Sequence, residues 1–278
     1  MKKLALTLAA ATAAFVGQAS AADMPMKAAR PVAAPIVAPS FTGLWISGGF
    51  GYGLAQFQHS EFEFAAPFPQ ASLGQDHGAK GWLGKVGVGY DYQFAGPFGS
   101  WVIGIFADTD WSDIKGNYQI NTASVPVGVI TASNLTGQFN HDWSWSVGGK
   151  IGYVALPGLL TYFNGGYTQG HFKGTNFINS TDPTALLATG IVAPARTRDG
   201  WFLGGGTDYA VSQLPGLFWK NEVRFSQFDN KSDTVVCVTA VGCAVGGVLT
   251  QNSRVYTQKV TTELVYRFNW GGPVVAKY

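Results

Sequence analysis

The stretch from Lys80 to Phe94, KGWLGKVGVGYDYQF, decides the fold more clearly than any other part of the chain. From Val86 to Phe94, large apolar side chains occupy every second position, and Trp82 keeps the same register. From Lys85 to Gln93, the positions between them carry glycine or polar residues. Such an alternation with a period of two is typical of a β-strand with one apolar and one polar face. The stretch therefore predicts a strand whose two faces meet different solvents.

The same alternation recurs along the chain and predicts eight strands. Segments of about ten residues with this pattern are typical of β-strands that cross an outer membrane. The predicted strands are Phe41 to Leu54, Lys80 to Phe94, Ser100 to Trp111, Phe139 to Tyr153, Leu159 to Gly170, Gly200 to Val211, Leu217 to Phe228 and Tyr256 to Phe268.

The links between these segments are alternately short and long. Three short links are rich in proline and glycine, at residues 95–99, 156–158 and 214–216. The four others are long and polar, near residues 55–79, 112–138, 171–199 and 229–255. This order predicts an all-β, eight-stranded antiparallel up-and-down transmembrane β-barrel with short periplasmic turns and four long extracellular loops. A ten-stranded barrel that uses part of a long loop is the alternative.

The first forty residues predict export. Two lysines follow Met1, an apolar stretch runs to Val16, and small residues ending at Ala21 form a cleavage site, which together are typical of a signal peptide. Residues 22–40 are rich in alanine and proline and are interpreted as a periplasmic tether. Residues 41–278 are assigned to the barrel, which places the protein in the cell outer membrane.

The composition supports a lipid-facing protein. Charged residues form 12% of the chain, against about 25% in an ordinary soluble domain, and aromatic residues form 14%. Without Lys2 and Lys3 of the signal peptide, sixteen basic and sixteen acidic residues remain. This balance provides no positive field for nucleic acid, so that class of partner is excluded.

Charged residues also occupy the inward face of the predicted strands. Both signs are present in similar number, and unpaired charges in a narrow lumen would be costly, so a network of salt bridges is expected. The network is interpreted as a plug, because eight strands leave an interior that side chains can fill, with an ion-conducting pore as the alternative. The lumen residues are Lys85, Asp91, Asp108, Asp110, Lys150, Asp208, Lys220, Glu222, Arg224, Lys259, Glu263 and Arg267.

The two cysteines, Cys237 and Cys243, predict a disulfide within an outer loop, with two free thiols as the alternative. No neighbouring histidine or cysteine completes a zinc site, and no metal is predicted. The Asp108-Thr-Asp110-Trp-Ser-Asp113 run lacks the central glycine and distant glutamate of a calcium loop. It is therefore not interpreted as a metal site.

No catalytic residues are predicted, and the chain is not expected to be an enzyme. Its four histidines fall in predicted loops or at outer strand ends, and none has a nucleophile in a productive position. They leave surface haem binding as a minority hypothesis. The histidines are His59, His77, His141 and His171.

Basic residues near the outer rim are candidate contacts for lipopolysaccharide phosphates. Ordinary solvated loop charge is the simpler interpretation. These residues are Arg196, Arg198, Lys231 and Arg254.

Several short runs resemble a known family. They are AADMPMKA at 21–28, GYDYQF at 89–94, GGKIGY at 148–153, GGGTDYA at 204–210 and VYRFNWGGP at 265–273. Together they resemble the outer-membrane immunogenic protein (surface antigen) family of alpha-proteobacterial small porin-like β-barrels. The resemblance implies surface exposure, a role in envelope integrity and host contact, and for some members haem binding or weak pore activity. Phe106 departs from it, since an acidic residue is expected there.

The end of the chain carries a candidate signal for the barrel-assembly machinery. Tyr-Arg-Phe at 266–268 resembles the aromatic terminus that this machinery recognises, yet ten residues follow it. Phe268 and Tyr278 are therefore both candidates for the assembly signal.

Overall fold

A computed structural model gives the fold of the chain and describes residues 39–64, 70–72, 76–124, 131–179, 188–237 and 248–268. The predicted signal peptide and most of the predicted tether lie outside these residues. None of the described segments is a helix long and apolar enough to cross a membrane.

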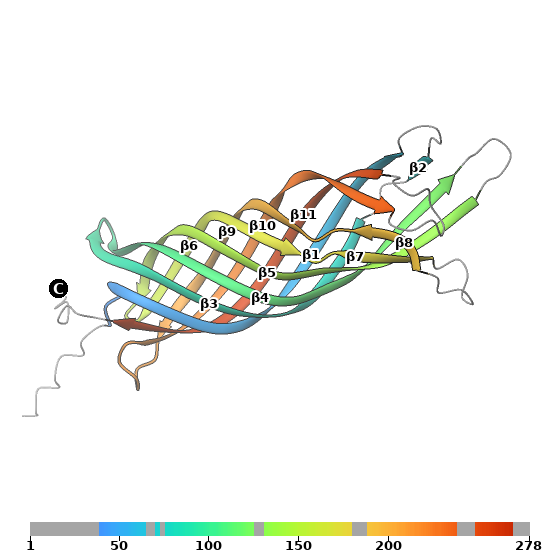
Figure 1. Ribbon diagram of the computed structural model, residues 1–278. Helices are drawn as coiled ribbons and strands as arrows, with labels where there is room; N and C mark the ends of the chain where they lie inside the picture. Colours follow the sequence, from blue (N-terminus) through green and yellow to red (C-terminus); the bar gives the residue numbers. More distant parts are fainter. Residues whose placement is uncertain are drawn as a thin grey trace, which may run out of the picture. The chain divides into compact units, whose positions relative to one another are not determined.

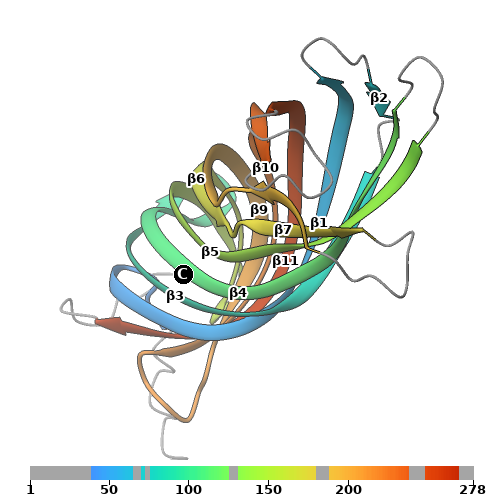
Figure 2. The same cartoon turned by 45° about the vertical axis from the view of Figure 1, so that its right-hand side comes forward.

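Eight long strands form a closed antiparallel ring (Figures 1 and 2). Each strand pairs with its neighbours in the chain, and the first pairs with the last, from Leu44 opposite Phe268 to Phe64 opposite Leu249. This closure confirms the predicted eight-stranded barrel and leaves no unpaired edge in the ring. The strands are β1 (Gly43–Phe64), β3 (Asp76–Gly96), β4 (Gly99–Ser124), β5 (Thr131–Leu156), β6 (Leu159–Phe172), β9 (Arg196–Ala210), β10 (Leu217–Cys237) and β11 (Val248–Phe268).

Three short strands extend the sheet at the end with the long links. β2 (Gln70–Ser72) pairs with β1 and β4. β7 (Thr175–Asn179) and β8 (Ala188–Ala193) pair with each other, and they also pair with β5 and β10, respectively. They therefore continue the wall beyond the ends of β6 and β9.

Tight turns close the opposite end of the barrel. Gly158 and Gly216 adopt φ angles of 85° and 86° in the links β5–β6 and β9–β10. A residue with a Cβ rarely adopts this left-handed conformation, which explains glycine at both positions. Since short turns lie on the periplasmic side of outer-membrane barrels, this end is the periplasmic end.

The strands run farther outward than the sequence predicted. The first strand was expected to end at Leu54, but β1 continues to Phe64, and most of the predicted loop 112–138 belongs to β4 and β5. Beyond Leu54 the outward side chains are polar, as at Gln56 and Gln58. The apolar outer face ends where the barrel leaves the membrane, although backbone pairing continues.

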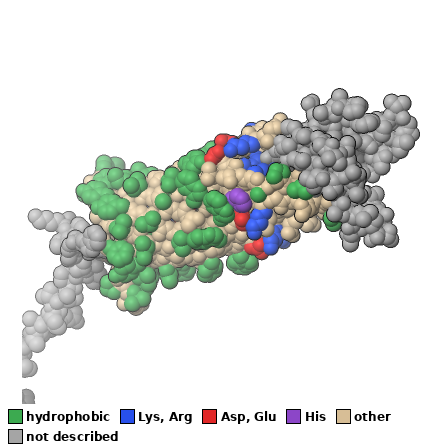
Figure 3. Space-filling view, in the orientation of Figure 1, with side chains coloured by type: hydrophobic (Ala, Val, Ile, Leu, Met, Phe, Trp, Pro, Cys, Tyr) green, Lys and Arg blue, Asp and Glu red, His purple; other side chains and the backbone are tan. Residues whose placement is uncertain are grey.

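The outward surface of the spanning part is apolar. Ile105, Phe163 and Leu203 are among its most exposed side chains. Exposed tryptophans, such as Trp82 and Trp219, lie towards its ends, as expected of aromatic girdles. Figure 3 shows the hydrophobic surface and, at one end of it, a belt of charged side chains.

The inward surface carries two buried apolar clusters. The inner cluster, towards the periplasmic end, contains Phe41, Trp45, Val102, Phe106, Leu160, Tyr162, Phe202, Phe218 and Val265. The outer cluster contains Ala55, Phe57, Ala79, Ile114, Phe139, Phe172, Phe177, Ala193, Phe228 and Val255.

Candidate functional site

The barrel lumen is the candidate functional site, because all twelve charged residues expected there are buried in it, each at most 8% exposed. Strand alternation places them inward, and strand tilt determines which of them meet across the lumen. Their contacts divide them into three groups, called here the inner, middle and outer groups.

The inner group contains two cations and two carboxylates: Arg267, Lys150, Asp91 and Asp208. Arg267 binds Asp91 and Asp208 with separate nitrogens, and Lys150 Nζ lies 2.8 Å from Asp91 Oδ2. The Arg267 guanidinium also lies 4.9 Å from the ring centre of Phe218. These contacts tie β11 to β3, β5 and β9 across the interior.

The middle group contains three cations and three carboxylates: Lys85, Lys220, Arg224, Asp108, Glu222 and Glu263. Lys85 Nζ lies 3.0 Å from both Glu222 and Glu263. Arg224 binds both oxygens of Asp108, at 2.9 and 2.7 Å. A two-pronged contact of this kind fixes both position and orientation.

The outer group is a single pair. Lys259 Nζ lies 2.8 Å from both oxygens of Asp110. The Ser144 hydroxyl donates to Asp110 at 2.6 Å and accepts from Lys259 at 2.8 Å. Each of the three groups therefore has no formal net charge.

The lumen holds little free space around these groups. Between Trp45, Lys150 and Glu222, a gap leaves about 0 Å³ for a water molecule. The outer cluster covers the other side, where Phe172 packs against Phe139 and Phe228 at ring-centre distances of 5.3 and 5.5 Å. Rings of the inner cluster lie among the charged groups: the guanidinium of Arg224 lies 4.3 Å from the ring centre of Phe202, as that of Arg267 lies beside Phe218. Charged and aromatic side chains therefore pack together in this part of the lumen.

Glycine at inward positions makes room for the charged side chains. A Cβ added at Gly104 would collide with the carboxylate of Asp91. The glycine-rich run that contains Gly204 lies in strand β9.

Sequence reasoning missed the apolar side chains that pack in the lumen with the charged ones. Phe57 and Phe228 face the lumen although the apolar residues Leu54 and Phe225 lie on the outward face of the same strands. The apolar positions change from one face to the other near the outer girdle. That change of the apolar face was the signal in the sequence that could have predicted the outer cluster.

The three histidines whose side chains are described, His77, His141 and His171, form no metal-binding cluster among the described residues. The expectation of four rim histidines was wrong for His141, which is 0% exposed and packs its ring 5.0 Å from that of Phe172. His171 Nδ1 lies 2.6 Å from Asp142 Oδ1, His77 is partly exposed, and the side chain of His59 lies outside the described residues. In the described ranges, no three histidine, cysteine or acidic side chains meet as metal ligands.

The predicted position was also wrong for one of the four basic residues expected at the outer rim. Arg198 is 1% exposed, and its guanidinium donates to the backbone carbonyl and hydroxyl of Ser253 inside the barrel. Strand structure is interrupted nearby, at residues 173–174 between β6 and β7 and at residues 194–195 between β8 and β9. Lys231 does lie at the rim and binds Asp199 at 2.9 Å.

The predicted disulfide and part of the predicted assembly signal lie outside the described residues. Cys243 and Tyr278 fall there, as does the side chain of Cys237. Phe268 is the last residue of β11, and its ring packs edge-on against Tyr266 at 5.0 Å.

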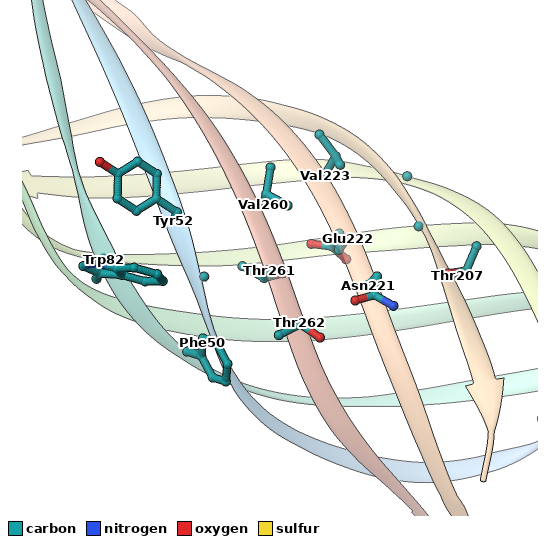
Figure 4. A pocket seen from close by; sticks show the side chains of 13 residues that line it. Phe50, Tyr52, Trp82, Thr207, Asn221, Glu222, Val223, Val260, Thr261 and Thr262 are labelled. Carbon is teal, nitrogen blue, oxygen red and sulfur yellow. The ribbon is translucent and has the colours of Figure 1, made fainter.

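A groove of about 340 Å³ runs along the outward surface of the barrel over β1, β9, β10 and β11. Figure 4 shows Phe50, Tyr52 and Trp82 on one side of it and Val223 and Val260 on the other. These five side chains point outward, so the surface they form meets the hydrocarbon chains of the membrane.

Comparison with known proteins identifies relatives of the chain. No protein-family model matches it. It is 31% identical over 209 residues to the 31 kDa outer-membrane immunogenic proteins of Brucella melitensis and Brucella suis, a match that covers 74% of this chain and 80% of each relative.

Solved structures of outer-membrane proteins have lower sequence identity to this chain. OprG from Pseudomonas aeruginosa gives a TM-score of 0.41 at 11% identity, covering 84% of this chain and all of that one. The protease OmpT from Escherichia coli gives 0.44 at 10% identity, covering 81% and 97% of the two chains. The level of identity to the Brucella proteins shows that this chain, an integral protein of the outer membrane, belongs to the outer-membrane immunogenic protein family.

Proposed function

We propose that this protein is a sealed outer-membrane barrel with a structural and surface-interactive role. Its lumen serves as an internal brace that stabilises the wall, and its outer end meets the environment or a host. Its partners are the outer-membrane lipid, including lipopolysaccharide, the barrel-assembly machinery and ligands at the cell surface.

The observation that carries this proposal is the pairing of each lumen charge with an opposite charge in a closely packed interior. An ion entering the lumen would have to displace a lysine or arginine from a carboxylate that it contacts at about 3 Å, as Lys85 contacts Glu222. Breaking a buried pair of this kind costs about 3–5 kcal/mol. An ion would meet such a barrier at each of the three groups, which favours a plug over a narrow porin.

The proposal includes no catalytic activity. The described serine–histidine contact, 2.8 Å from Ser112 Oγ to His141 Nδ1, involves an imidazole that is fully buried. A general base must reach the proton that it removes from a bound substrate. The burial of His141 supports a packing role for this pair.

Single-channel conductance in a planar bilayer tests the proposal. Refolded protein, with its folded state established by a heat-shifted gel band, is expected to give no discrete current steps. A general porin reconstituted in parallel provides the positive control. Reproducible steps that disappear when the protein is unfolded by heat would overturn the proposal in favour of the narrow-porin alternative.

A further inference from the structure

Two lysines face each other on the outward surface of neighbouring strands. Lys80 of β3 lies directly opposite Lys115 of β4 in the antiparallel register, and both side chains are exposed. Like charges opposite one another destabilise a sheet. Lys115 is partly compensated by Asp113, 2.5 Å away, whereas Lys80 has no ion pair among the described residues. The pair therefore attracts a further anion.

These lysines border a groove that also has an apolar part. The groove, about 900 Å³ in volume, runs over β1 to the aromatic side chains Phe225 and Tyr256, whose rings stack at 6.0 Å. Leu54, which is 49% exposed, lies between the lysines and the two rings. The lining also includes the exposed carboxylate of Asp76, four positions from Lys80 on β3. A ligand beside Lys80 and Lys115 would meet positive charge there and an apolar surface at the other end of the groove.

The groove lies at the boundary of the membrane. Trp82, an exposed girdle residue, precedes Lys80 on β3 when the strand is followed outward from the periplasmic end. Just outside this girdle, lipid phosphates meet the protein surface. Free phosphate would use only the lysines, whereas a phosphorylated lipid would also use Leu54 and the aromatic rings.

We propose that this groove binds a phosphorylated glycolipid of the outer leaflet, with Lys80 and Lys115 holding a phosphate of the lipid A headgroup and Leu54, Phe225 and Tyr256 contacting its sugar and acyl chain. Lysine binds phosphate as a point charge, and two such charges on adjacent strands can share one phosphate. The site is independent of whether the lumen conducts.

Native mass spectrometry of detergent-solubilised protein with bisphosphorylated lipid A tests the proposal. Replacing both lysines (K80Q/K115Q) is expected to weaken lipid A binding by about 30-fold, with each lysine contributing as a basic residue does at an anionic membrane surface. The control K173Q removes the charge of an exposed lysine outside the groove and is expected to bind as the wild type does. The variant K80R/K115R is expected to keep binding.

Two further measurements make the test specific. Dephosphorylated lipid A, with the same acyl chains, is expected to bind the wild type as weakly as lipid A binds K80Q/K115Q. Leu54→Glu keeps both lysines and places a carboxylate beside them, so it is also expected to weaken binding. Equal binding of lipid A by wild type and K80Q/K115Q, both folded by the heat-shift criterion, would overturn the proposal. So would equal binding of the two lipids by the wild type.

Discussion

Replacing Lys259 by methionine is expected to lower the free energy of unfolding of the barrel by about 3–5 kcal/mol. The substitution keeps a side chain of similar length but removes the only cation that contacts Asp110 in the outer group. The carboxylate, 4% exposed, keeps the hydroxyl of Ser144 as its partner. Leaving a buried charge without its counterion is the source of the loss.

The reverse substitution and the double variant extend this prediction to a thermodynamic cycle. Asp110→Leu leaves the Lys259 ammonium without its carboxylate and is expected to cost a similar 3–5 kcal/mol or so. In K259M/D110L both charges are gone and apolar side chains of similar size replace them. The double variant is expected to lie within about 2 kcal/mol of the wild type, because replacing a whole buried pair is often nearly neutral.

Equilibrium unfolding in guanidinium chloride, followed by tryptophan fluorescence in lipid vesicles, measures each corner of the cycle. With single losses of about 3–5 kcal/mol and a double loss of at most about 2 kcal/mol, the expected coupling free energy between the two positions is about 4 kcal/mol or more. A water-filled lumen would screen the pair, so each single substitution would cost about 1 kcal/mol or less. Single-variant losses of that size that add within about 0.5 kcal/mol would refute the sealed lumen.

Other substitutions probe the packing and the rim. Gly104→Ala is expected to destabilise the barrel by about 1–3 kcal/mol in the same assay. Gly149→Ala, whose new Cβ would have its nearest neighbour at 3.7 Å, should be tolerated. Equal stability of the two variants would contradict the crowding at Gly104. Phe228→Ala should cost about 3–5 kcal/mol but leave the planar bilayer silent, since the charged groups remain, and current steps would show that the outer cluster alone seals the lumen. At the rim, the hydrogen bond from Tyr167 holds the pKa of Asp199 below its usual value. Tyr167→Phe should therefore raise the pKa of Asp199, as measured by a carboxyl NMR titration. An unchanged pKa would exclude this hydrogen bond as the cause.

The spanning part of the fold could be predicted from the sequence because lipid imposes a strict alternation. Each strand must place apolar side chains outward at every second position, and the residues between them then face inward. The inward position of Lys85 and Glu222 follows from this pattern. That they meet does not, since they are 137 positions apart and strand tilt determines which side chains lie opposite across a lumen.

The outer part of the barrel could not be predicted by the same rule. Beyond Leu54 the outward face meets water and the inward face packs on aromatic rings, so the apolar positions move from Leu54 to Ala55 and Phe57. A search for one continuous apolar register ends the strand at this change. The chain continues as paired strand because the backbone hydrogen bonds do not depend on which face is apolar.

The neutral charge groups also have a consequence for assembly. Arg267 and Asp91 are 176 positions apart in the chain, and Arg224 and Asp108 are 116 apart, so these two contacts form only when early strands meet late ones. A sheet that has entered the membrane without closing would lack these two contacts and would keep only nearer ones, such as Arg224 with Glu222 and Lys85 with Asp108, so its buried ions would be less well compensated. Electrostatics therefore favours closure during assembly. A partially inserted sheet lacks these contacts, and the complete ring is the first state in which all the buried charges are paired as in the folded protein.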